Sequence, residues 1–223
     1  TQKNEFRVPK RLQGIEKSMI RQIADRALPG SINFGLGEPD LPTPDCIRNE
    51  AIRVISEEQN GYTLQAGIPV LREKIITEYP HLNLRIDDVV VTVGSSEALY
   101  CALMTLAEEG DEVLVPNPCF PAYLGIIQMS GAKTVYYRLP AEKGFAFDLE
   151  EFRKQITERT RVVMILSPSN PTGRVHTREE LKQIAEVLEG TGIYVVSDEI
   201  YSDVYFTEER PASISEYYDK TIV

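Results

Sequence analysis

The sequence is poor in the residues that build metal centres and disulfide networks. It has three cysteines, Cys46, Cys101 and Cys119, and two histidines, His81 and His176. The cysteines are odd in number, lie far apart and show neither metal-ligand nor disulfide spacing, which predicts free thiols in a reducing, cytoplasmic setting. Two histidines are too few for a histidine-rich metal site, so we expect no metal.

The sequence also lacks long apolar runs and an excess of basic residues. Its longest apolar runs are about five to seven residues, whereas crossing a bilayer takes roughly 20. The opening stretch, TQKNEFRVPKRLQ, contains no apolar core of a signal peptide. The formal net charge is -10, and nucleic-acid binding needs a basic face. We therefore expect neither a membrane nor a nucleic acid as a partner.

What the sequence does have is an alternation of strand patterns and helix patterns. Apolar runs predict strands at residues 88–93, 112–116, 133–139, 162–166 and 193–197. Helices are predicted at residues 45–58, 69–78, 95–108, 121–130, 149–156 and 177–188. Thr177 and Glu180 form a capping box at the start of the last helix. Strands that are apolar on both faces and joined by helices predict an α/β fold of three layers, α/β/α, with a mostly parallel sheet.

Two of the predicted strands are followed by stretches that could bind a phosphate group and an aromatic ring of a ligand. In open α/β sheets, ligands bind at the carboxyl ends of the strands. Gly94, Ser95 and Ser96 follow residues 88–93 and open a helix, whose free N–H groups suit a phosphate. Taken alone, an ordinary serine N-cap explains this stretch better, by about two to one. Phe120 follows residues 112–116 and suits either a stacking platform or the core.

Two further strand ends carry an amide, a carboxylate and a phenol. Asn170 lies in SPSNPTG after residues 162–166, and Asp198 and Tyr201 lie in SDEIY after residues 193–197. A carboxylate at such a position is often a solvated loop residue or a helix cap. Four strand ends in order, each with a candidate ligand group, instead predict one pocket for a flat, phosphorylated, nitrogen-containing ring.

The motifs at these positions resemble those of the pyridoxal-phosphate-dependent aminotransferases of fold type I, class I/II. They are GLGEPD (35–40), GYTLQAGIPVLR (61–72), GSSEAL (94–99), NPCFPAY (117–123), SPSNPTG (167–173) and SDEIY (197–201). The resemblance runs over essentially all 223 residues. A single motif is weak, but six in family order are strong support for the family and weaker support for a particular substrate.

The resemblance implies a role for each strand-end side chain. Asp198 would bind the pyridine nitrogen of pyridoxal phosphate and keep it protonated, so that the ring can accept electrons. Phe120 would lie on the ring face. Asn170 and Tyr201 would hydrogen-bond the ring's phenolate oxygen, and Asn170 would also reach the substrate carboxylate. The resemblance therefore makes Asp198 and Tyr201 the catalytic residues of this chain.

Other matching positions would bind the phosphate and the substrate. Gly94, Ser95 and Ser96 would hold the phosphate, and the backbone of Gly37 would approach the substrate carboxylate. Tyr62 resembles a tyrosine that reaches across a two-fold interface to the phosphate in the partner subunit. The resemblance therefore implies a homodimer that acts on an amino acid and a 2-oxo acid.

The sequence departs from the family pattern in its catalytic lysine. In the family this lysine forms the Schiff base with the cofactor and lies roughly thirty or more residues beyond the aspartate. Here only residues 199–223 follow Asp198, and their one lysine, Lys220, stands at the start of the expected next strand. We therefore expect a fragment that ends before the Schiff-base lysine and is inactive alone. Residues 1–40 would be the N-terminal arm and the start of the small domain, and residues 41–223 a partial cofactor-binding large domain, with the C-terminal part of the small domain missing.

Three functions are compatible with these motifs. The first is an aminotransferase that moves an amino group between an L-amino acid and a 2-oxo acid. The second is a carbon–sulfur lyase or a related eliminating enzyme of the same fold. The third, a non-enzymatic regulator that binds pyridoxal phosphate, is disfavoured because the residues before the first motif leave no room for a DNA-binding domain. A Rossmann dehydrogenase is disfavoured because no G-x-G-x-x-G follows the first strand.

Overall fold

The structure, a computed structural model, describes residues 7–15, 19–32, 34–35, 37, 41–57, 60–206 and 208–223. It divides into two compact units. The sheet unit consists of Thr1–Ile15, Tyr79–Leu84 and Thr92–Val223, and the helical unit of Glu16–Glu78 and Arg85–Val91. The predicted domain division at residues 40 and 41 concerns the domains of whole enzymes and stays a prediction.

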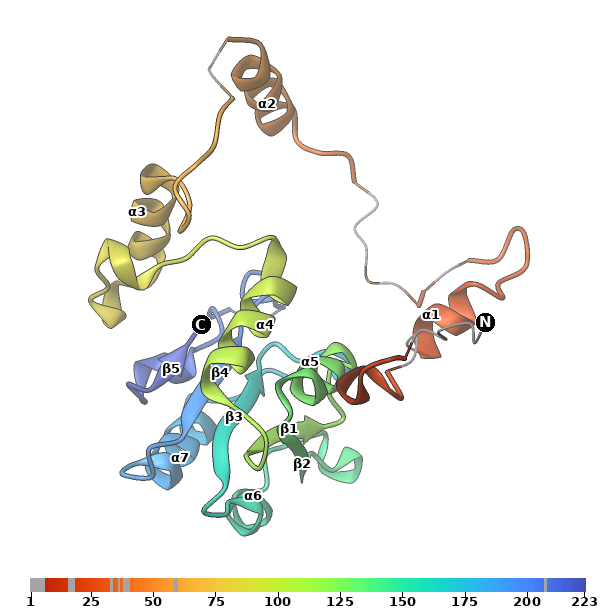
Figure 1. Cartoon of the computed structure of the whole chain (residues 1–223), viewed down its shortest axis with the longest axis vertical. Helices are drawn as coiled ribbons and strands as arrows, with labels where there is room; N and C mark the ends of the chain where they lie inside the picture. The colour runs from red at the N-terminus through yellow and green to blue at the C-terminus, as the bar shows by residue number, and fades with distance from the viewer. Residues whose placement is uncertain are drawn as a thin grey trace, which may run out of the picture. The chain divides into compact units, whose positions relative to one another are not determined.

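The sheet unit is built on five strands that all run parallel, in the order β2-β1-β3-β4-β5 (Figure 1). The strands are β1 (Glu112–Asn117), β2 (Lys133–Arg138), β3 (Thr160–Leu166), β4 (Tyr194–Asp198) and β5 (Thr221–Ile222). β1 and β3 are buried along almost their whole length. This burial on both faces explains why they read as continuous apolar runs.

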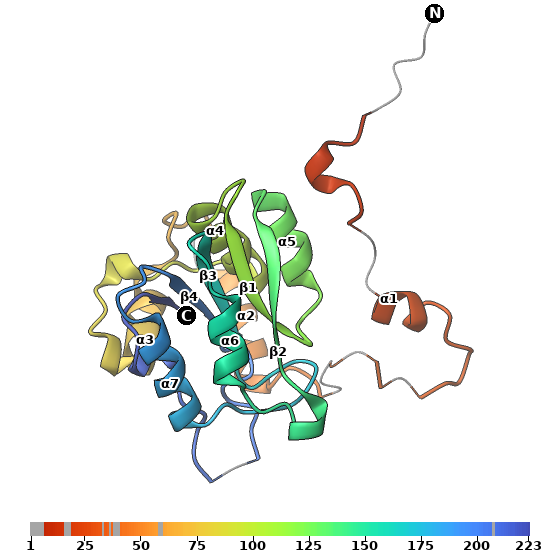
Figure 2. The same cartoon turned by 90° about the horizontal axis from the view of Figure 1, so that it is seen from below.

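Helices cover both faces of this sheet (Figure 2). They are α4 (Gly94–Leu106), α5 (Ala122–Ser130), α6 (Leu149–Gln155) and α7 (Arg178–Leu188). The 3-10 turns of the unit are η1 (Lys10–Leu12), η2 (Pro80–Leu82), η4 (Ala141–Lys143) and η5 (Ile214–Glu216). One core cluster joins α4 and α5 to Val113, Val162 and Val196, and a second joins α6 and α7 to Leu114 and Val195. The predicted three-layer α/β fold is confirmed.

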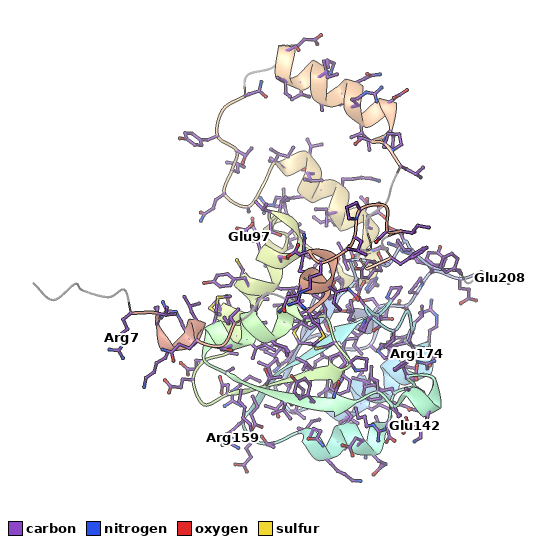
Figure 3. All side chains as sticks on the ribbon, turned by 90° about the vertical axis from the view of Figure 1, so that its right-hand side faces the viewer. Arg7, Glu97, Glu142, Arg159, Arg174 and Glu208 are labelled. Carbon is purple, nitrogen blue, oxygen red and sulfur yellow. The ribbon has the colours of Figure 1, made fainter. Side chains whose placement is uncertain are left out.

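Charged side chains close the amino-terminal edge of the sheet. The buried carboxylate of Glu112 accepts a hydrogen bond from Thr157 Oγ1 at 2.6 Å. It also pairs with Arg159 at 3.1 Å and Lys133 at 3.5 Å, and Arg159 is labelled in Figure 3. The Thr157 hydroxyl and then these two cations lower the pKa of Glu112 against the effect of burial. Four of the predicted ligand groups, Phe120, Asn170, Asp198 and Tyr201, stand at or just after the other, carboxyl-terminal ends of β1, β3 and β4.

The helical unit contains α1 (Met19–Ala24), α2 (Asp45–Glu57), α3 (Pro69–Glu78) and the 3-10 turn η3 (Ile86–Asp88). Its buried Arg72 donates from Nε to the Val89 carbonyl at 2.9 Å and from Nη2 to the Ile86 carbonyl. None of the helices in the described ranges of either unit is long and apolar enough to cross a membrane.

The predicted strand at residues 88–93 is wrong. Asp88 ends η3, and residues 89–93 are not in a strand. The N–H of Val91 instead donates to the Ala66 carbonyl at 2.9 Å, and the N–H of Gly94 to the Thr92 carbonyl. A strand exists only where a neighbour pairs with its backbone, and no strand among the described residues does so here. The apolar composition of residues 89–93 is typical of a strand. Whether a strand forms also depends on a neighbouring strand that pairs with it, and the local sequence does not show this neighbour.

Candidate functional site

Asp198 is the last residue of β4, and its buried carboxylate accepts two hydrogen bonds from the protein. Its side chain Oδ2 accepts a hydrogen bond from the Tyr123 hydroxyl at 2.7 Å, and Oδ1 accepts one from the Ile200 N–H at 3.3 Å. Alternation along the strand places Asp198 on the same face as Val196, which packs with Tyr123 in the α4–α5 core cluster. No ion pair involves Asp198 within the described ranges. The carboxylate is therefore oriented by neutral donors alone.

Tyr123 on α5 is a site residue that the sequence reasoning missed. Its side chain is fully buried, and its ring meets the Phe120 ring edge-on, with centroids 5.6 Å apart. Burial, and then the charge of Asp198, raises the pKa of the Tyr123 phenol far above its ordinary value, so the phenol stays protonated and donates. The buried face of α5 consists of Tyr123, Ile126 and Ile127. In the sequence this spacing looks like an ordinary apolar helix face, so it does not mark Tyr123 as a site residue. The available signal was that a buried tyrosine hydroxyl needs a partner.

Phe120 and Tyr201 approach the same core cluster from two loops. Phe120 lies between β1 and α5, Tyr201 follows β4, and both are half-buried and pack against the cluster that contains Tyr123. The structure thus brings Phe120, Asp198 and Tyr201 to one end of one face of the sheet. This grouping places an aromatic ring, a carboxylate and a phenol around Tyr123.

The SPSNPTG segment forms a tight turn beside Asp198. The N–H of Ser167 donates to the Asp198 carbonyl at 3.3 Å, which extends the pairing of β3 and β4 by one step. Ser169 closes the turn, because its carbonyl accepts from the Gly173 N–H at 2.7 Å. Gly173 has φ +69, a left-handed conformation that favours glycine. Asn170 is half-buried within this turn, and the bonds before Pro168 and Pro171 are cis.

Gly94, Ser95 and Ser96 form the first turn of α4. The N-cap position is Val93, which has no capping side chain, so the two serines are inside the helix. The explanation of this stretch as an ordinary serine N-cap is therefore wrong. Gly94 has φ +72, and an added Cβ would meet nothing within 4 Å. The Gly94 N–H donates to the Thr92 carbonyl at 2.9 Å, so the N–H groups of Ser95 and Ser96 and the partial positive charge at the start of this 13-residue helix are what suits a phosphate in the open space.

Two predicted site residues belong to the helical unit. Gly37 lies in its described part, and the Tyr62 side chain is fully exposed there. Their roles toward the substrate and toward a partner subunit stay predictions.

Lys220 lies at the wrong edge of the sheet to reach these groups. Its carbonyl accepts from the Val195 N–H at 2.8 Å, and its ammonium stands 5.8 Å from the Tyr194 ring centroid. Tyr194 begins β4 and Asp198 ends it. Four residue steps of about 3.3 Å separate the two ends of that strand. This placement agrees with setting Lys220 aside as the Schiff-base residue.

The residues at the carboxyl edge fit pyridoxal phosphate. A buried carboxylate without a cationic partner suits a protonated ring nitrogen, and the start of α4 suits a phosphate. No group of three or more His, Cys, Asp or Glu in the part of the chain that the structure describes could hold a metal. A pocket of about 330 Å³ at the ends of β1 and β2 is lined by none of the predicted site residues.

Comparison with known proteins gives a consistent result. A family model described as aminotransferase class I and II matches residues 29–223. The chain is 36% identical over 219 residues to a probable aspartate aminotransferase of Methanocaldococcus jannaschii, covering 97% of this chain and 58% of the relative. It is 40% identical over 191 residues to a probable aspartate/prephenate aminotransferase of Aquifex aeolicus, covering 83% and 48%.

A solved structure gives the same picture. The aspartate aminotransferase from Thermus thermophilus with maleate matches with a TM-score of 0.91 at 30% identity, covering 97% of this chain and 59% of that chain. The chain therefore spans about half to three fifths of the length of these proteins.

Proposed function

The chain belongs to the class I and II aminotransferase family, and on this premise we propose that the whole protein is a pyridoxal-phosphate-dependent aminotransferase. It would move an amino group between an L-amino acid and a 2-oxo acid. The observation that carries the proposal is the buried Asp198 carboxylate, which has neutral donors but no cationic partner among the described residues. Because an unpaired buried charge is costly, the missing partner is expected to be a cationic group of the ligand.

The residues around Asp198 would bind and orient the cofactor. When bound, pyridoxal phosphate supplies a protonated ring that accepts electrons from the substrate. Asp198 would hold the proton on the ring nitrogen, and Tyr123 would fix that carboxylate. Phe120 would cover one ring face and exclude water from it. The first turn of α4, at Gly94 to Ser96, would bind the phosphate, with the amides of Ser95 and Ser96 as donors.

Asn170 and Tyr201 would bind the oxygen substituent of the ring. Asn170 and the Gly37 backbone would also bind the carboxylate of the amino acid. Tyr62 would reach the phosphate of a second copy, so the proposal includes a homodimer. All three cysteines are free thiols, which supports a reducing cytoplasmic setting.

The relatives favour transamination over elimination, because those compared above have aminotransferase names. Two of them are named for aspartate alone, so L-aspartate is the first amino acid to test. We further propose that residues 1–223 alone are inactive. Lys220 stands at the opposite edge of the sheet from Asp198, and a positioned proton-transfer group is normally worth about 10² to 10⁴ in rate.

The test is the rate of glutamate formation by the whole protein with pyridoxal phosphate, L-aspartate and 2-oxoglutarate. Asp198→Asn keeps the shape of the side chain but removes its charge, and we expect a loss on the order of 10³-fold. Asp203→Asn is the matched control, because Asp203 is an exposed acid in the following loop. Near-wild-type turnover in Asp198→Asn would refute the proposed role of this carboxylate.

A further inference from the structure

We propose that the ion pair between Arg174 and Glu180 positions Asn170. The pair lies outside the SPSNPTG turn and anchors it to the start of α7. Both are positioning residues, since neither would touch cofactor or substrate. The inference rests on the proposed function, because that function gives Asn170 its task.

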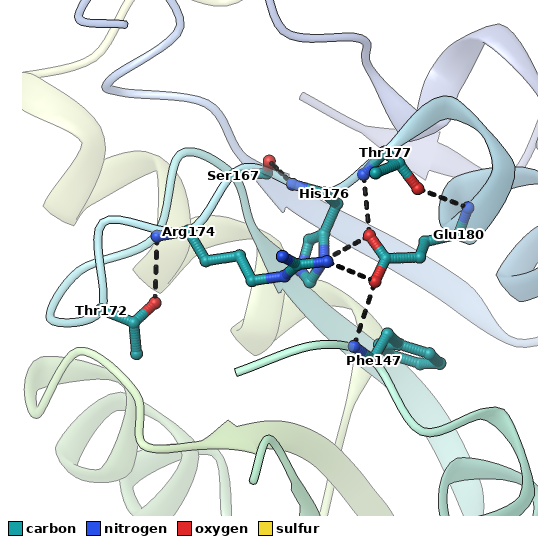
Figure 4. A network of polar contacts seen from close by, with 7 residues as sticks. All are labelled: Phe147, Ser167, Thr172, Arg174, His176, Thr177 and Glu180. Carbon is teal, nitrogen blue, oxygen red and sulfur yellow. Dashed lines mark hydrogen bonds and ion pairs between the residues drawn. The ribbon is translucent and has the colours of Figure 1, made fainter. Parts of the chain in front are cut away.

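Glu180 joins three segments of the chain through one carboxylate (Figure 4). Its Oε1 accepts from Arg174 Nη2 at 2.7 Å and from the Phe147 N–H at 3.1 Å. Its Oε2 accepts from the Thr177 N–H at 2.8 Å, which completes the capping box of α7. The Glu180 side chain is only 15% exposed. A carboxylate with three donors from a turn, a loop and a helix cap fixes all three relative to one another.

The backbone of Arg174 is hydrogen-bonded to the SPSNPTG turn, so the contact of its side chain with Glu180 also holds the turn. Its carbonyl accepts from the Ser169 N–H at 2.8 Å, and its own N–H donates to Thr172 Oγ1 at 3.2 Å. Ser169 is the residue immediately before Asn170, and its carbonyl accepts from the Gly173 N–H. Two backbone bonds at Ser169 therefore relate the position of Asn170 to that of Arg174.

Glu180 is the acidic partner of Arg174 that the described residues show. The Nε of Arg174 is buried and has no hydrogen-bond partner among the described residues, so Glu180 provides the compensation for its charge. His176 does not compete for Glu180, because its Nδ1 lies 3.9 Å from Oε2, too far for a hydrogen bond. Burial lowers the pKa of His176 to about 4, so at neutral pH its ring is uncharged. The cation that faces Glu180 is therefore Arg174.

The first residue of the turn, Ser167, is held by contacts that do not involve the ion pair. The N–H of His176 donates to Ser167 Oγ at 3.0 Å, and the His176 ring meets the Phe147 ring edge-on, with centroids 6.0 Å apart. Loss of the ion pair would thus leave the turn attached at Ser167, while the segment bonded to Ser169 would lose the contact of Arg174 with the start of α7. We expect a local displacement of Asn170 rather than unfolding.

The experiment compares Glu180→Gln and Arg174→Met with Glu179→Gln in the whole protein with pyridoxal phosphate. Glu179 is the matched control, because it is the neighbouring, exposed residue in the same first helical turn and contacts Gln183. Two quantities are measured: hydrogen exchange of the Ser169 and Gly173 amides, and KM and kcat for the amino acid. Arg174→Lys serves as the conservative variant.

We expect Glu180→Gln and Arg174→Met to speed exchange at both amides by about tenfold or more, with core strand amides unchanged. They should raise KM for the amino acid by about tenfold and change kcat less, since the displaced group binds the substrate carboxylate. Arg174→Lys should recover part of both effects. The double variant should be no worse than either single one, because the two residues form one interaction. Glu179→Gln should behave like wild type.

Asn170→Ala separates the failure of this inference from that of the proposed function. A raised KM in Asn170→Ala together with wild-type KM and exchange in Glu180→Gln would overturn the positioning role alone. An unchanged KM in Asn170→Ala would overturn both the substrate-binding role of Asn170 and the inference built on it. Exchange that rises equally throughout the sheet would show a general loss of stability and would also overturn the inference.

Discussion

A single hydroxyl, that of Tyr123, connects α5 to the carboxylate at the end of β4. The two residues are 75 positions apart in the chain, and the hydrogen bond between them is buried. A hydrogen bond to a charged group contributes about 1.5–3 kcal/mol. Its loss would leave Asp198 with one backbone donor and more rotational freedom.

We therefore expect Tyr123→Phe to lower kcat/KM of the whole enzyme by about ten- to hundredfold. The fold should be retained, because the ring still packs against Phe120. Tyr100→Phe, on the exposed surface of α4, is the control and should have little effect. A Tyr123→Phe enzyme with wild-type kinetics would contradict the role of this hydroxyl.

His176 makes stability depend on pH in a known direction. Burial, and to a smaller extent Arg174, lowers its pKa from 6.5 to about 4 in the folded state, while Glu180 acts in the opposite sense. Above pH 6.5 the residue is neutral in both states and contributes nothing to the pH dependence. Between pH 6.5 and 4 the unfolded state binds a proton that the folded state does not, so stability falls as pH falls.

We expect this group to cost up to about 2 kcal/mol of unfolding free energy by pH 5. Urea denaturation at several pH values should show a flatter profile for His176→Leu than for wild type. The comparison is made above pH 5, because the lowered pKa of Glu180 adds its own loss of stability at lower pH. Parallel profiles for the two proteins would show that His176 does not titrate in this way.

Among the elements, those with local signals were predicted well. β1, β3 and β4 begin and end within about two residues of the apolar runs that predict them. The capping box placed the start of α7 at Thr177, which is its N-cap. The local sequence does not show the unpaired backbone of residues 89–93 or the role of Tyr123, because strand pairing and the partner of a buried hydroxyl depend on segments far away in the chain. The roles of Gly37 and Tyr62 depend on contacts beyond one unit and stay predictions.

The start of α4 gives a prediction at the scale of an element. Gly94→Ala places a side chain in a left-handed backbone conformation and over the open space before the helix. We expect a stability loss of about 1–2 kcal/mol and an affinity for pyridoxal phosphate that is several-fold weaker.

Gly110→Ala is the matched control, since Gly110 has φ +99 and also faces open space. It should lose similar stability with no change in cofactor affinity. Equal affinities in both variants, measured by titration of cofactor into each protein, would argue against phosphate binding at Gly94.

At the scale of the whole molecule, the proposed dimer shares its sites. If Tyr62 acts in the site of the partner, Tyr62→Phe and Asp198→Asn impair the same site from two different subunits. A heterodimer of the two variants then contains one site with both native residues and one with neither.

Mixing the two inactive variants under conditions that exchange subunits should therefore restore roughly a quarter of wild-type activity per site. Each variant mixed with itself is the control and should stay inactive. Absence of any restored activity in a mixture that demonstrably contains heterodimers would place Tyr62 outside the partner's site.

The central claim is that the whole protein transfers an amino group and does not eliminate one. The most direct measurement is a single reaction of the protein, loaded with pyridoxal phosphate, with an excess of L-aspartate and no 2-oxo acid. The account predicts one equivalent of oxaloacetate per bound cofactor, no release of ammonia, and a change in the visible absorption that 2-oxoglutarate reverses. Continued release of ammonia beyond one equivalent, or no reaction with aspartate or any other amino acid, would contradict it.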